Sequence, residues 1–436
     1  MKNKEGFLHS LQELVAYPSV KGAAQEGAPF GRGIQDSLEA ALAQAARAGF
    51  KTYIDPDGYY GYSQFGEGED YFGVLGHLDV VPIGSRDDWK NDPFTMVQEE
   101  GYLYGRGVSD DKGPTLLAFY ALCELLEEGM ELKMPVRFIY GTDEESGWQC
   151  MERYVESEKH PIMGFTPDSG FPLVYAEKGV LNLRLSGKGS DVNYKAGGAL
   201  NVVPSEALYP FSDSLAEHLK ALGAETLEKD GNLHVLGKNS HAARVEDGIN
   251  ALVLLLSAFH GDGKESPAAL FVKERLYGAH FGEKLLRISE DDLSGKASVN
   301  LGRVDLSAEE EILELDMRYP VSFDYDELID ELRQVALLYG FELDVTSHLA
   351  PIYIDREGEL VQSLLAAYRK VSGDDTPAQI SGGATYARAM ENLVAFGPSF
   401  PWSESTEHQP NERVKMEEFE MAFNIYKEAF RNLVGK

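Results

Sequence analysis

The stretch YFGVLGHLDVVPIG, residues 71–84, decides the fold because it has the pattern of a buried strand that ends in two polar residues, His77 and Asp79. Side chains alternate between the two faces of a strand, so His77 and Asp79 point the same way and can hydrogen-bond to each other. Taken alone, a His-x-Asp pair is more often a buried histidine with satisfied hydrogen bonds than a functional pair. The rest of the chain has to distinguish these two interpretations.

Strand and helix patterns alternate around this stretch. Apolar runs occur at 71–76, 135–141 and 162–165, and a helical pattern at 114–128 opens with a proline, which is favoured in the first turn of a helix. The same alternation returns after residue 351. It predicts an α/β fold with a mixed, largely parallel sheet flanked by helices.

The middle of the chain has a different character. Strands with alternating apolar residues are mixed there with helical patterns near 249–260 and 326–339, which predicts an inserted α+β domain. The segments LSGKGSD and VLGKNSH share the pattern GKxS, which is either chance or a sign of two subdomains. We therefore expect a discontinuous sheet domain and an inserted lid, with the bounds 1–184 plus 351–436 and 185–350, respectively.

The composition excludes several classes of function. Of the 436 residues, 72 are acidic and 40 basic, and the formal net charge of -32 repels nucleic acid and anionic membrane surfaces. The N-terminal segment lacks the continuous apolar core of a signal peptide, and no later stretch approaches a membrane span. We therefore expect a cytoplasmic protein without nucleic acid or membrane partners.

The cysteine content restricts the kind of metal site. Only Cys123 and Cys150 occur, and neither lies in a CxxC pair. Neither a disulfide framework nor a zinc–thiolate site is indicated, so any metal ion would be bound by histidines and carboxylates.

Further polar residues follow other apolar runs. GRGVSDDKGP contains Asp110, TDEES contains Glu144 and Glu145, TPDSG contains Asp168, and SESTEHQPNE contains His408. Taken separately, an aspartate before a helix is usually a cap. Adjacent glutamates repel each other unless they are solvated or neutralised, and a metal ion is a strong way to neutralise one of them.

The position of these polar residues is the strongest signal. The carboxyl ends of the strands in an open α/β sheet lie along one edge, where ligand crevices form. The polar residues can therefore meet His77 although they are far apart in the sequence. Two histidines and several carboxylates, without a thiolate, suit one or two divalent ions such as zinc, manganese or cobalt.

The motifs HLDVVP, GRGVSDDKGP, GTDEES, PDSG and TEHQ, in this order, resemble the signatures of the co-catalytic dinuclear zinc peptidases, which include aminoacylases, glutamate carboxypeptidases and desuccinylases. Within this family the chain is similar to the branch of bacterial dipeptidases typified by peptidase V, the carnosinase-like Xaa-His dipeptidases. The resemblance implies a zinc exopeptidase-like catalytic domain with two Zn2+ per chain, or Mn2+ or Co2+ in their place. It places His77 and Asp168 at one ion, Glu145 and His408 at the other, and Asp110 between them.

The resemblance also assigns catalytic roles. It implies that Glu144 is the general base acting on the water that bridges the two ions, and that Asp79 fixes the tautomer and direction of His77. His241, in GKNSHAARVEDGINA, matches the histidine that stabilises the oxyanion. The chain departs from the family in this loop, because Val245 stands where a proline is common.

Substrate contacts are implied in the same way. Arg318, in LDMRYP, matches the arginine that binds a substrate carboxylate, and Asn201 matches an asparagine that contacts substrate. Gly382 and Gly383 match a glycine-rich loop that lines the cleft. Without the resemblance, Arg318 would be a strand residue paired with an acid, His241 a surface histidine and Asn201 a turn former.

We expect a metal-dependent dipeptidase that hydrolyses short unblocked peptides with a free C-terminal carboxylate, using a bridging water activated by two metal ions. An N-acyl amino acid amidohydrolase of the desuccinylase, aminoacylase or deacetylase type uses the same metal core and is the alternative. A catalytically inactive peptide- or metal-binding relative is a second alternative, against which the candidate base Glu144 argues. The GKxS repeat indicates a monomer whose second lid subdomain replaces the partner of dimeric relatives, and a homodimer is the alternative.

Overall fold

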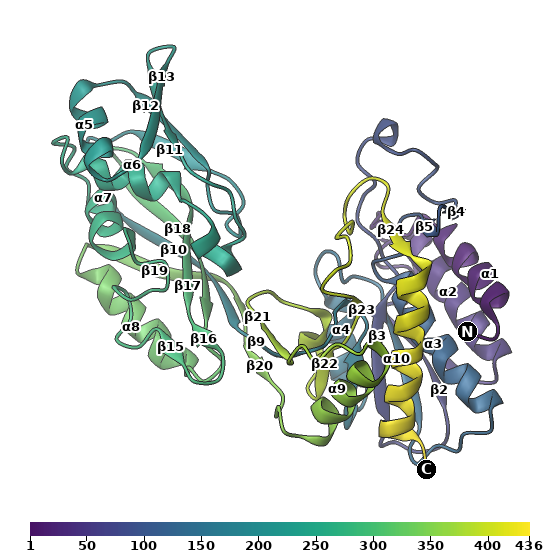
Figure 1. The fold of residues 1–436 in the computed structure, drawn as a ribbon. Coiled ribbons are helices and arrows are strands. Elements are labelled where there is room, and N and C mark those ends of the chain that lie inside the picture. The colour runs from purple at the N-terminus through teal and green to yellow at the C-terminus, as the bar shows by residue number, and fades with distance from the viewer. The chain divides into compact units, whose positions relative to one another are not determined.

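The computed structural model describes residues 1–436, and the chain divides into two compact units (Figure 1). Unit 1 comprises Met1–Tyr175, Ile354–Gln379 and Thr385–Lys436, and unit 2 comprises Ala176–Tyr353 and Ile380–Ala384. The first crossing comes earlier than the expected bound at residue 184, because one strand of unit 2 continues through that position. The short return of Ile380–Ala384 to unit 2 has no counterpart among the sequence-based expectations.

Unit 1 is built on a mixed sheet. Its strands follow the order β1 (Lys51–Ile54), β2 (Gly61–Phe65), β6 (Val136–Gly141), β3 (Phe72–His77), β7 (Met163–Thr166), β22 (Leu393–Ala395) and β9 (Val174–Glu177). The central pairs β6–β3, β3–β7 and β7–β22 are parallel, and the pairs on either side are antiparallel. The sheet confirms the predicted α/β fold with a mixed, largely parallel sheet.

Helices flank this sheet, as predicted. They are α1 (Lys4–Val15), α2 (Arg32–Arg47), α3 (Lys112–Glu127), α4 (Gln149–Ser157), α9 (Glu359–Ser372) and α10 (Met416–Val434). Every residue of β3 is buried because the strand runs between two neighbours and under helices. Aromatic rings join α10 to the sheet: Phe165 stacks on Tyr426 with 5.5 Å between ring centroids, and Phe72 contacts Phe430 edge-on at 6.1 Å.

Small elements complete unit 1. The three-stranded sheet has the order β24 (Arg413–Lys415), β5 (Tyr102–Tyr104) and β4 (Val97–Glu99), and a two-stranded pair joins β23 (Pro398–Ser399) to β8 (Ser169–Gly170). Two 3-10 turns lie at η1 (Arg86–Asp88) and η4 (Tyr386–Ala389). The β24–β5 pairing brings the C-terminal part of the chain beside the segment that leads into α3.

Unit 2 has an antiparallel five-stranded sheet. Its order is β11 (Tyr194–Gly197), β17 (Ser298–Leu306), β18 (Glu310–Tyr319), β10 (Gly179–Lys188) and β19 (Phe341–Leu349). A three-stranded sheet has the order β12 (Glu206–Pro210), β14 (Asn232–Leu236) and β13 (Glu225–Lys229). The helices are α5 (Asp213–Ala221), η2 (Ala242–Asp247), α6 (Ala251–Phe259), α7 (Pro267–Phe271), the π-helical η3 (Val272–Leu276) and α8 (Tyr325–Leu337). β15 (Glu290–Asp291) pairs with β16 (Gly295–Lys296), whereas β20 (Ile352–Tyr353) and β21 (Gln379–Ser381) both pair with β9 and complete the nine-stranded sheet.

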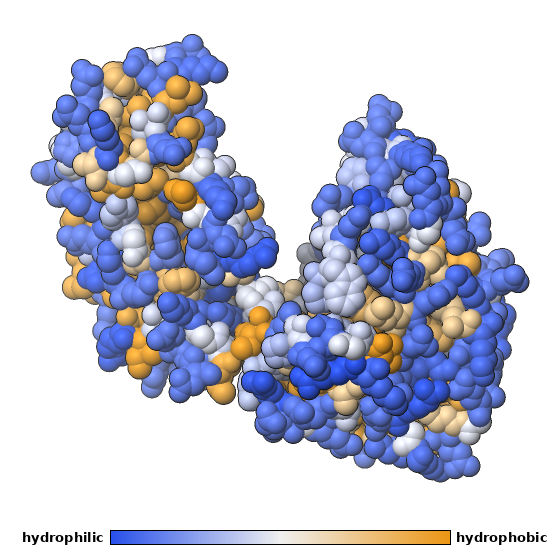
Figure 2. All heavy atoms as spheres, viewed as in Figure 1, coloured by the Kyte–Doolittle hydropathy of each residue, from blue (hydrophilic) through white to orange (hydrophobic).

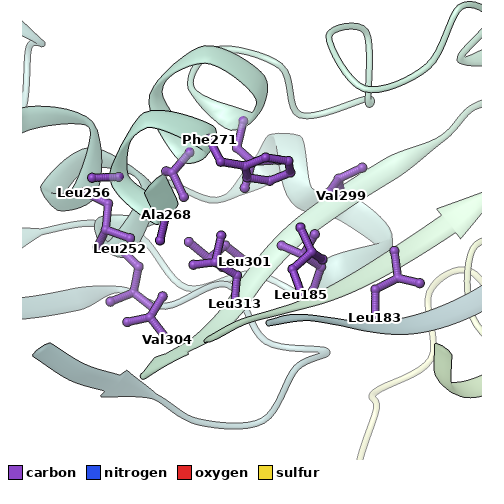
Figure 3. Close-up of a cluster of buried hydrophobic side chains, with 14 of the residues drawn as sticks. Leu183, Leu185, Leu252, Leu256, Ala268, Phe271, Val299, Leu301, Val304 and Leu313 are labelled. Carbon is purple, nitrogen blue, oxygen red and sulfur yellow. The ribbon is translucent and has the colours of Figure 1, made fainter. Parts of the chain in front are cut away.

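The core of unit 2 lies between the five-stranded sheet and α6 and α7. Figure 3 shows Leu185, Leu301 and Leu313 from the strands facing Leu252 and Phe271 from the helices, and all five are buried. The same hydrophobic cluster includes residues of the three-stranded sheet, so the two sheets of unit 2 share one core. Alternating apolar residues on β10 face this core, which is the pattern expected of a half-buried strand.

The exposed surface is rich in hydrophilic residues (Figure 2). Figure 2 shows a face that is mostly hydrophilic, with scattered apolar side chains. No helix combines the length and the apolar character that a transmembrane span requires.

Candidate metal centre

The parallel strands of unit 1 place four polar residues at one edge of the sheet. His77 is the last residue of β3, Glu144 and Glu145 follow β6, and Asp168 follows β7. Since β6, β3 and β7 are parallel neighbours, their carboxyl ends coincide. Ligand atoms of His77, Glu144 and Asp168 all lie within 4.8 Å of one another.

Asp110 connects this edge to the C-terminal part of the chain. Its Oδ1 lies 3.0 Å from Nε2 of His77, and its Oδ2 lies 2.8 Å from Nε2 of His408. Oε2 of Glu145 lies 3.2 Å from the same nitrogen of His408, and Oδ2 of Asp168 lies 3.8 Å from Nε2 of His77. The structure therefore brings together all five residues that the sequence predicted as metal ligands.

A glycine permits this close arrangement. Gly76 precedes His77 in β3, and a Cβ atom at this position would overlap the hydroxyl of Thr115 in α3. Thr115 donates a hydrogen bond to Asp111 Oδ2 at 2.6 Å, and this oxygen also accepts the backbone N–H of His77 at 3.2 Å. The start of α3 is thereby fixed against the end of β3, which places Asp110 beside His77.

The chemistry of these residues fits divalent cations. Oε1 of Glu145 is buried and has no hydrogen-bond partner, which is costly for a carboxylate that no cation neutralises. Burial, followed by the charge of Asp110, raises the pKa of Asp168 well above its ordinary value. Two imidazoles and several carboxylates, without a thiolate, form a donor set suited to zinc, manganese or cobalt.

Hydrogen bonds among the candidate ligands shift the pKa values of the two histidines and of Asp110. Burial opposes the charged form of His77, but hydrogen bonds to Asp110 and Asp79 outweigh it and raise its pKa well above the ordinary value. Hydrogen bonds to Asp110 and Glu145 raise the pKa of His408 to about 10. Burial would raise the pKa of Asp110, but hydrogen bonds to the two histidines lower it. The site thus favours positive charge on either side of Asp110.

Asp79 contacts its neighbours differently from the expected arrangement. Nδ1 of His77 lies 3.0 Å from the backbone carbonyl oxygen of Asp79, whereas the nearest carboxylate oxygen is 3.6 Å away. The carboxylate instead accepts the backbone N–H groups of Glu144 and Glu145, each at 3.1 Å. The carbonyl therefore orients the imidazole with Nε2 toward Asp110, and the carboxylate positions the turn that carries the two glutamates.

Burial gives Glu144 an unusual pKa. Burial is the largest cause of the rise in the pKa of Glu144 to about 7, and the negative charges of Glu145, Asp79 and Asp110 raise this pKa further. A carboxylate with this pKa can accept and release a proton near neutral pH.

The sequence did not single out Glu412, which connects two parts of the site. Its buried carboxylate accepts the backbone N–H groups of Gly107, Ser109 and Asp110 at 3.0, 2.8 and 3.2 Å, and Nη1 of Arg106 at 2.7 Å. Glu412 thereby holds the segment before α3 against the chain that follows His408. The sequence signal was a glutamate four residues after a candidate histidine, which is weak without coordinates.

The predicted oxyanion and substrate residues lie in unit 2. His241 is the N-cap of η2, and its Nδ1 accepts the backbone N–H of Ala243 at 3.1 Å. The carbonyl of Asn201 accepts the backbone N–H of Ala242 at 2.9 Å. Gly382 lies against this turn, because a Cβ there would be 2.9 Å from the Cβ of Ala243.

Arg318 has a buried acidic partner in the same strand. Its Nε and Nη2 donate to the two carboxylate oxygens of Asp316 at 2.6 and 2.8 Å, and its Nη1 donates to the carbonyl of Gly382 at 3.1 Å. Gly383 belongs to the same short segment, and its N–H donates to the hydroxyl of Ser381 at 2.9 Å. An arginine has five N–H groups, so two remain on Arg318. The pairing is the one expected of a structural strand arginine, and it leaves N–H groups for a ligand.

Sequence comparison identifies one family. Residues 73–432 match the sequence model of Peptidase family M20/M25/M40. A Staphylococcus saprophyticus protein named "Putative dipeptidase" is 34% identical over 465 residues. That alignment covers 99% of this chain and 98% of the relative.

Solved structures share the fold at lower identity. The aminoacylhistidine dipeptidase from Vibrio alginolyticus has a TM-score of 0.62 and 13% identity, with 100% of this chain and 98% of that chain covered. The M20 family metallo-carboxypeptidase Sso-CP2 from Sulfolobus solfataricus has a TM-score of 0.59 and 21% identity, with 98% of each chain covered. At these identities the likeness shows the fold alone.

Proposed function

Because the chain belongs to Peptidase family M20/M25/M40 and is therefore a peptide-bond hydrolase, we propose that it is a metal-dependent dipeptidase acting on short unblocked peptides with a free C-terminal carboxylate. One observation carries the proposal: a single carboxylate, Asp110, lies within hydrogen-bond distance of both His77 and His408, with the partly buried Glu144 nearby. The name of the Staphylococcus saprophyticus relative supports the dipeptidase activity.

The proposed metal ligands fall into two sets around Asp110. His77 and Asp168 would hold one ion, and Glu145 and His408 would hold the other. Two Zn2+ ions, or Mn2+ or Co2+, would acidify a water molecule there and polarise the scissile carbonyl. The distances among the five side chains and the unpartnered oxygen of Glu145 support this assignment.

Glu144 is the proposed general base. It would take a proton from the attacking water and deliver it to the nitrogen of the leaving amine. Its burial, and the pKa that burial raises to about 7, suit both transfers. The carboxylate of Asp79 holds the backbone of Glu144 by a 3.1 Å hydrogen bond, so Asp79 is the proposed positioning residue for this base.

His241 is the proposed oxyanion donor. Since its Nδ1 accepts an N–H from the backbone, the neutral ring carries its proton on Nε2, which can donate to a developing negative charge. Burial and then the charge of Arg318 lower the pKa of His241, which favours this neutral form. A donor of this kind typically lowers the barrier by about 3 to 4 kcal/mol.

The remaining unit 2 residues are proposed substrate contacts. Arg318 would offer its two remaining N–H groups to the carboxylate of the substrate. Gly382 and Gly383 would line the bound peptide, and Asn201 would contact it. The hydrogen bonds from Arg318 to Gly382 and from Ala242 to Asn201 support a common substrate surface in unit 2.

Metal reconstitution with paired substrates tests this function. The protein is freed of metal with a chelator, zinc, manganese and cobalt are restored separately, and hydrolysis of unblocked dipeptides is compared with that of their N-acetylated counterparts. We expect metal-dependent cleavage of the unblocked peptides. Preferential cleavage of the N-acetylated compounds would make the protein an N-acyl amino acid amidohydrolase, and no cleavage with any metal would contradict both activities.

We also propose that the protein is a cytoplasmic monomer. The repeat of GKxS at 187–190 and 237–240 supports two related parts of the insert, which share one core, and the second part would replace a partner subunit. Light scattering after size-exclusion chromatography should give the mass of one chain, about 48.1 kDa. A stable dimer would contradict the proposal.

A further inference from the structure

Arg244 is an exposed cation without an acidic partner in unit 2. It belongs to η2, three residues after His241, and its side chain forms no ion pair or hydrogen bond. Its backbone is fixed: its N–H donates to the carbonyl of His241 at 2.8 Å, and its carbonyl accepts the hydroxyl of Ser240 at 2.7 Å. A fixed backbone with a free guanidinium is suited to binding an anion from outside the protein.

Arg318 has no such free charge. Asp316 neutralises it through two short hydrogen bonds, and both side chains are buried. A carboxylate that approached Arg318 would therefore also meet the negative charge of Asp316. The two remaining N–H groups of Arg318 can direct a carboxylate, but the Arg318–Asp316 pair contributes no net attraction to it.

Of the three charges that act on His241, those of Arg318 and Asp316 cancel, which leaves the charge of Arg244. The turn η2 also carries two exposed acids, Glu246 and Asp247, which are not among the charges that act on this imidazole. Burial, then Arg318 and, more weakly, Arg244 lower the pKa of His241, while Asp316 opposes them, so all three charges act on this imidazole. In a chain with a formal net charge of -32, an anionic substrate needs a local cation to offset the general repulsion.

We propose that Arg244 is a specificity residue that binds the C-terminal carboxylate of the substrate, while Arg318 orients the same carboxylate through its two remaining N–H groups. The inference rests on the proposed dipeptidase function and deepens it. Arg244 supplies one cation for one carboxylate, and Glu246 and Asp247 of the same turn repel a second one, so the preferred substrates are dipeptides whose C-terminal residue has no acidic side chain. The alternative is that Arg244 is a solvated surface charge without a role in substrate binding.

Paired substrates test the proposal in the metal-loaded enzyme. Alanyl-leucine and its C-terminal amide differ only in the group that Arg244 would bind. For Arg244→Ala we expect the KM for alanyl-leucine to rise roughly tenfold to a hundredfold, as for loss of a charge-assisted hydrogen bond, with kcat changed by less than about twofold. Turnover of the amide should be the same in the wild type and in the variant, and Arg244→Lys should restore part of the affinity.

Lys229→Ala is the matched control. Lys229 is another exposed cation of unit 2 without an ion pair, in β13, so this variant makes the same change in net charge away from η2. We expect its kinetics to match those of the wild type. An equal loss in both Arg244→Ala and Lys229→Ala would assign the effect to net charge and overturn the inference.

A binding measurement separates this inference from the proposed function. Calorimetry with leucine and leucinamide requires no turnover. We expect the wild type to bind leucine more tightly than leucinamide, and Arg244→Ala to lose that difference. Equal binding of leucine by the wild type and Arg244→Ala would overturn the role of Arg244 even if the wild type cleaves dipeptides. A wild type that discriminates through Arg244 but cleaves no dipeptide would contradict the proposed function alone.

Discussion

The buried carboxylate of Glu412 accepts the backbone N–H of Asp110, with 3.2 Å between the nitrogen and Oε1. Asp110 is the residue whose two oxygens face His77 and His408, and Glu412 follows His408 in the same loop. The hydrogen bond therefore ties the shared ligand to the segment that carries the second histidine. Rigid support of this kind keeps ligand atoms in place before a metal ion arrives.

Replacing Glu412 should loosen the site and the fold together. Glu412→Ala removes the partner of buried Arg106 and leaves three backbone N–H groups without their acceptor. Breaking a buried pair typically costs about 3 to 5 kcal/mol, and we expect a loss of unfolding free energy of this order in urea. Glu417→Ala, at an exposed position of α10 without an ion pair, is the control and should change little. An unchanged urea midpoint for Glu412→Ala would show that the hydrogen bonds of Glu412 do not stabilise the protein.

Replacing Glu144 should abolish hydrolysis without releasing the metal ions from their site. Glu144→Ala removes the proposed base, and general acid–base groups contribute roughly a hundredfold to ten-thousandfold in rate. We expect kcat to fall by at least about a hundredfold, with the metal content per chain unchanged by atomic emission spectrometry. Glu152→Ala, an exposed glutamate in α4, provides the comparison and should retain full activity. Wild-type turnover by Glu144→Ala would rule out Glu144 as the base.

Asp79 should act mainly through Glu144. Its two carboxylate oxygens accept the N–H groups of Glu144 and Glu145, and an asparagine offers only one acceptor oxygen for these two bonds. For Asp79→Asn we expect kcat to fall by roughly tenfold to a hundredfold, the value of one charge-assisted hydrogen bond, with KM nearly unchanged. The backbone carbonyl that orients His77 is retained, so metal content should persist. If the variant loses its metal but keeps its kcat after metal is added back, Asp79 positions the metal ligands and not the base Glu144.

The metal-free protein should be less stable at pH 9 than at pH 6. Burial raises the pKa of Glu412 to about 7 and, together with nearby carboxylates, that of Glu144 to about 7, so their stabilising protons are lost as the pH rises through 7. Hydrogen bonds to Asp110 and Glu145 raise the pKa of His408 to about 10, and its contribution is lost between its ordinary value of 6.5 and 10. All three groups change stability in the same direction. Buried Lys112, whose pKa burial lowers to about 7, acts in the opposite direction above that pH, and we expect the three groups together to outweigh it.

Urea unfolding after chelation measures this dependence. The midpoint should fall from pH 6 to pH 9, and added zinc should reduce the difference because metal binding replaces the protons. A midpoint that rises with pH in the metal-free protein would contradict the assigned pKa shifts.

The strand-end residues of the site were predictable from the sequence. His77, Glu144, Glu145 and Asp168 each follow an apolar run, and parallel pairing of β6, β3 and β7 brings the ends of such runs to one edge. The α/β fold class follows from the same alternation. Fold class and the gathering of these residues depend on pattern and topology, which the sequence carries.

Contacts that depend on fractions of an ångström were not predictable. His-x-Asp spacing predicts that Asp79 faces His77, but the choice between its carbonyl at 3.0 Å and its carboxylate at 3.6 Å depends on the turn at Glu144 and Glu145. Glu412 lies in a polar loop, where a glutamate is ordinarily solvated. Its burial requires the pairing of β24 with β5, which joins segments far apart in the chain.

The limits of the two units also required coordinates. β10 continues to Lys188, so the change of composition near residue 184 falls inside a strand of unit 2. Ile380–Ala384 joins unit 2 because it lies against the η2 turn and accepts a hydrogen bond from Arg318. Neither contact leaves a local pattern in the sequence.

Anomalous diffraction at the zinc edge from zinc-soaked crystals tests the central claim most directly. The account predicts two peaks per chain, roughly 3.5 to 4 Å apart, with Asp110 between them, His77 and Asp168 at one and Glu145 and His408 at the other. Peaks that lie away from Asp110, or a single ion bound by other residues, would contradict it.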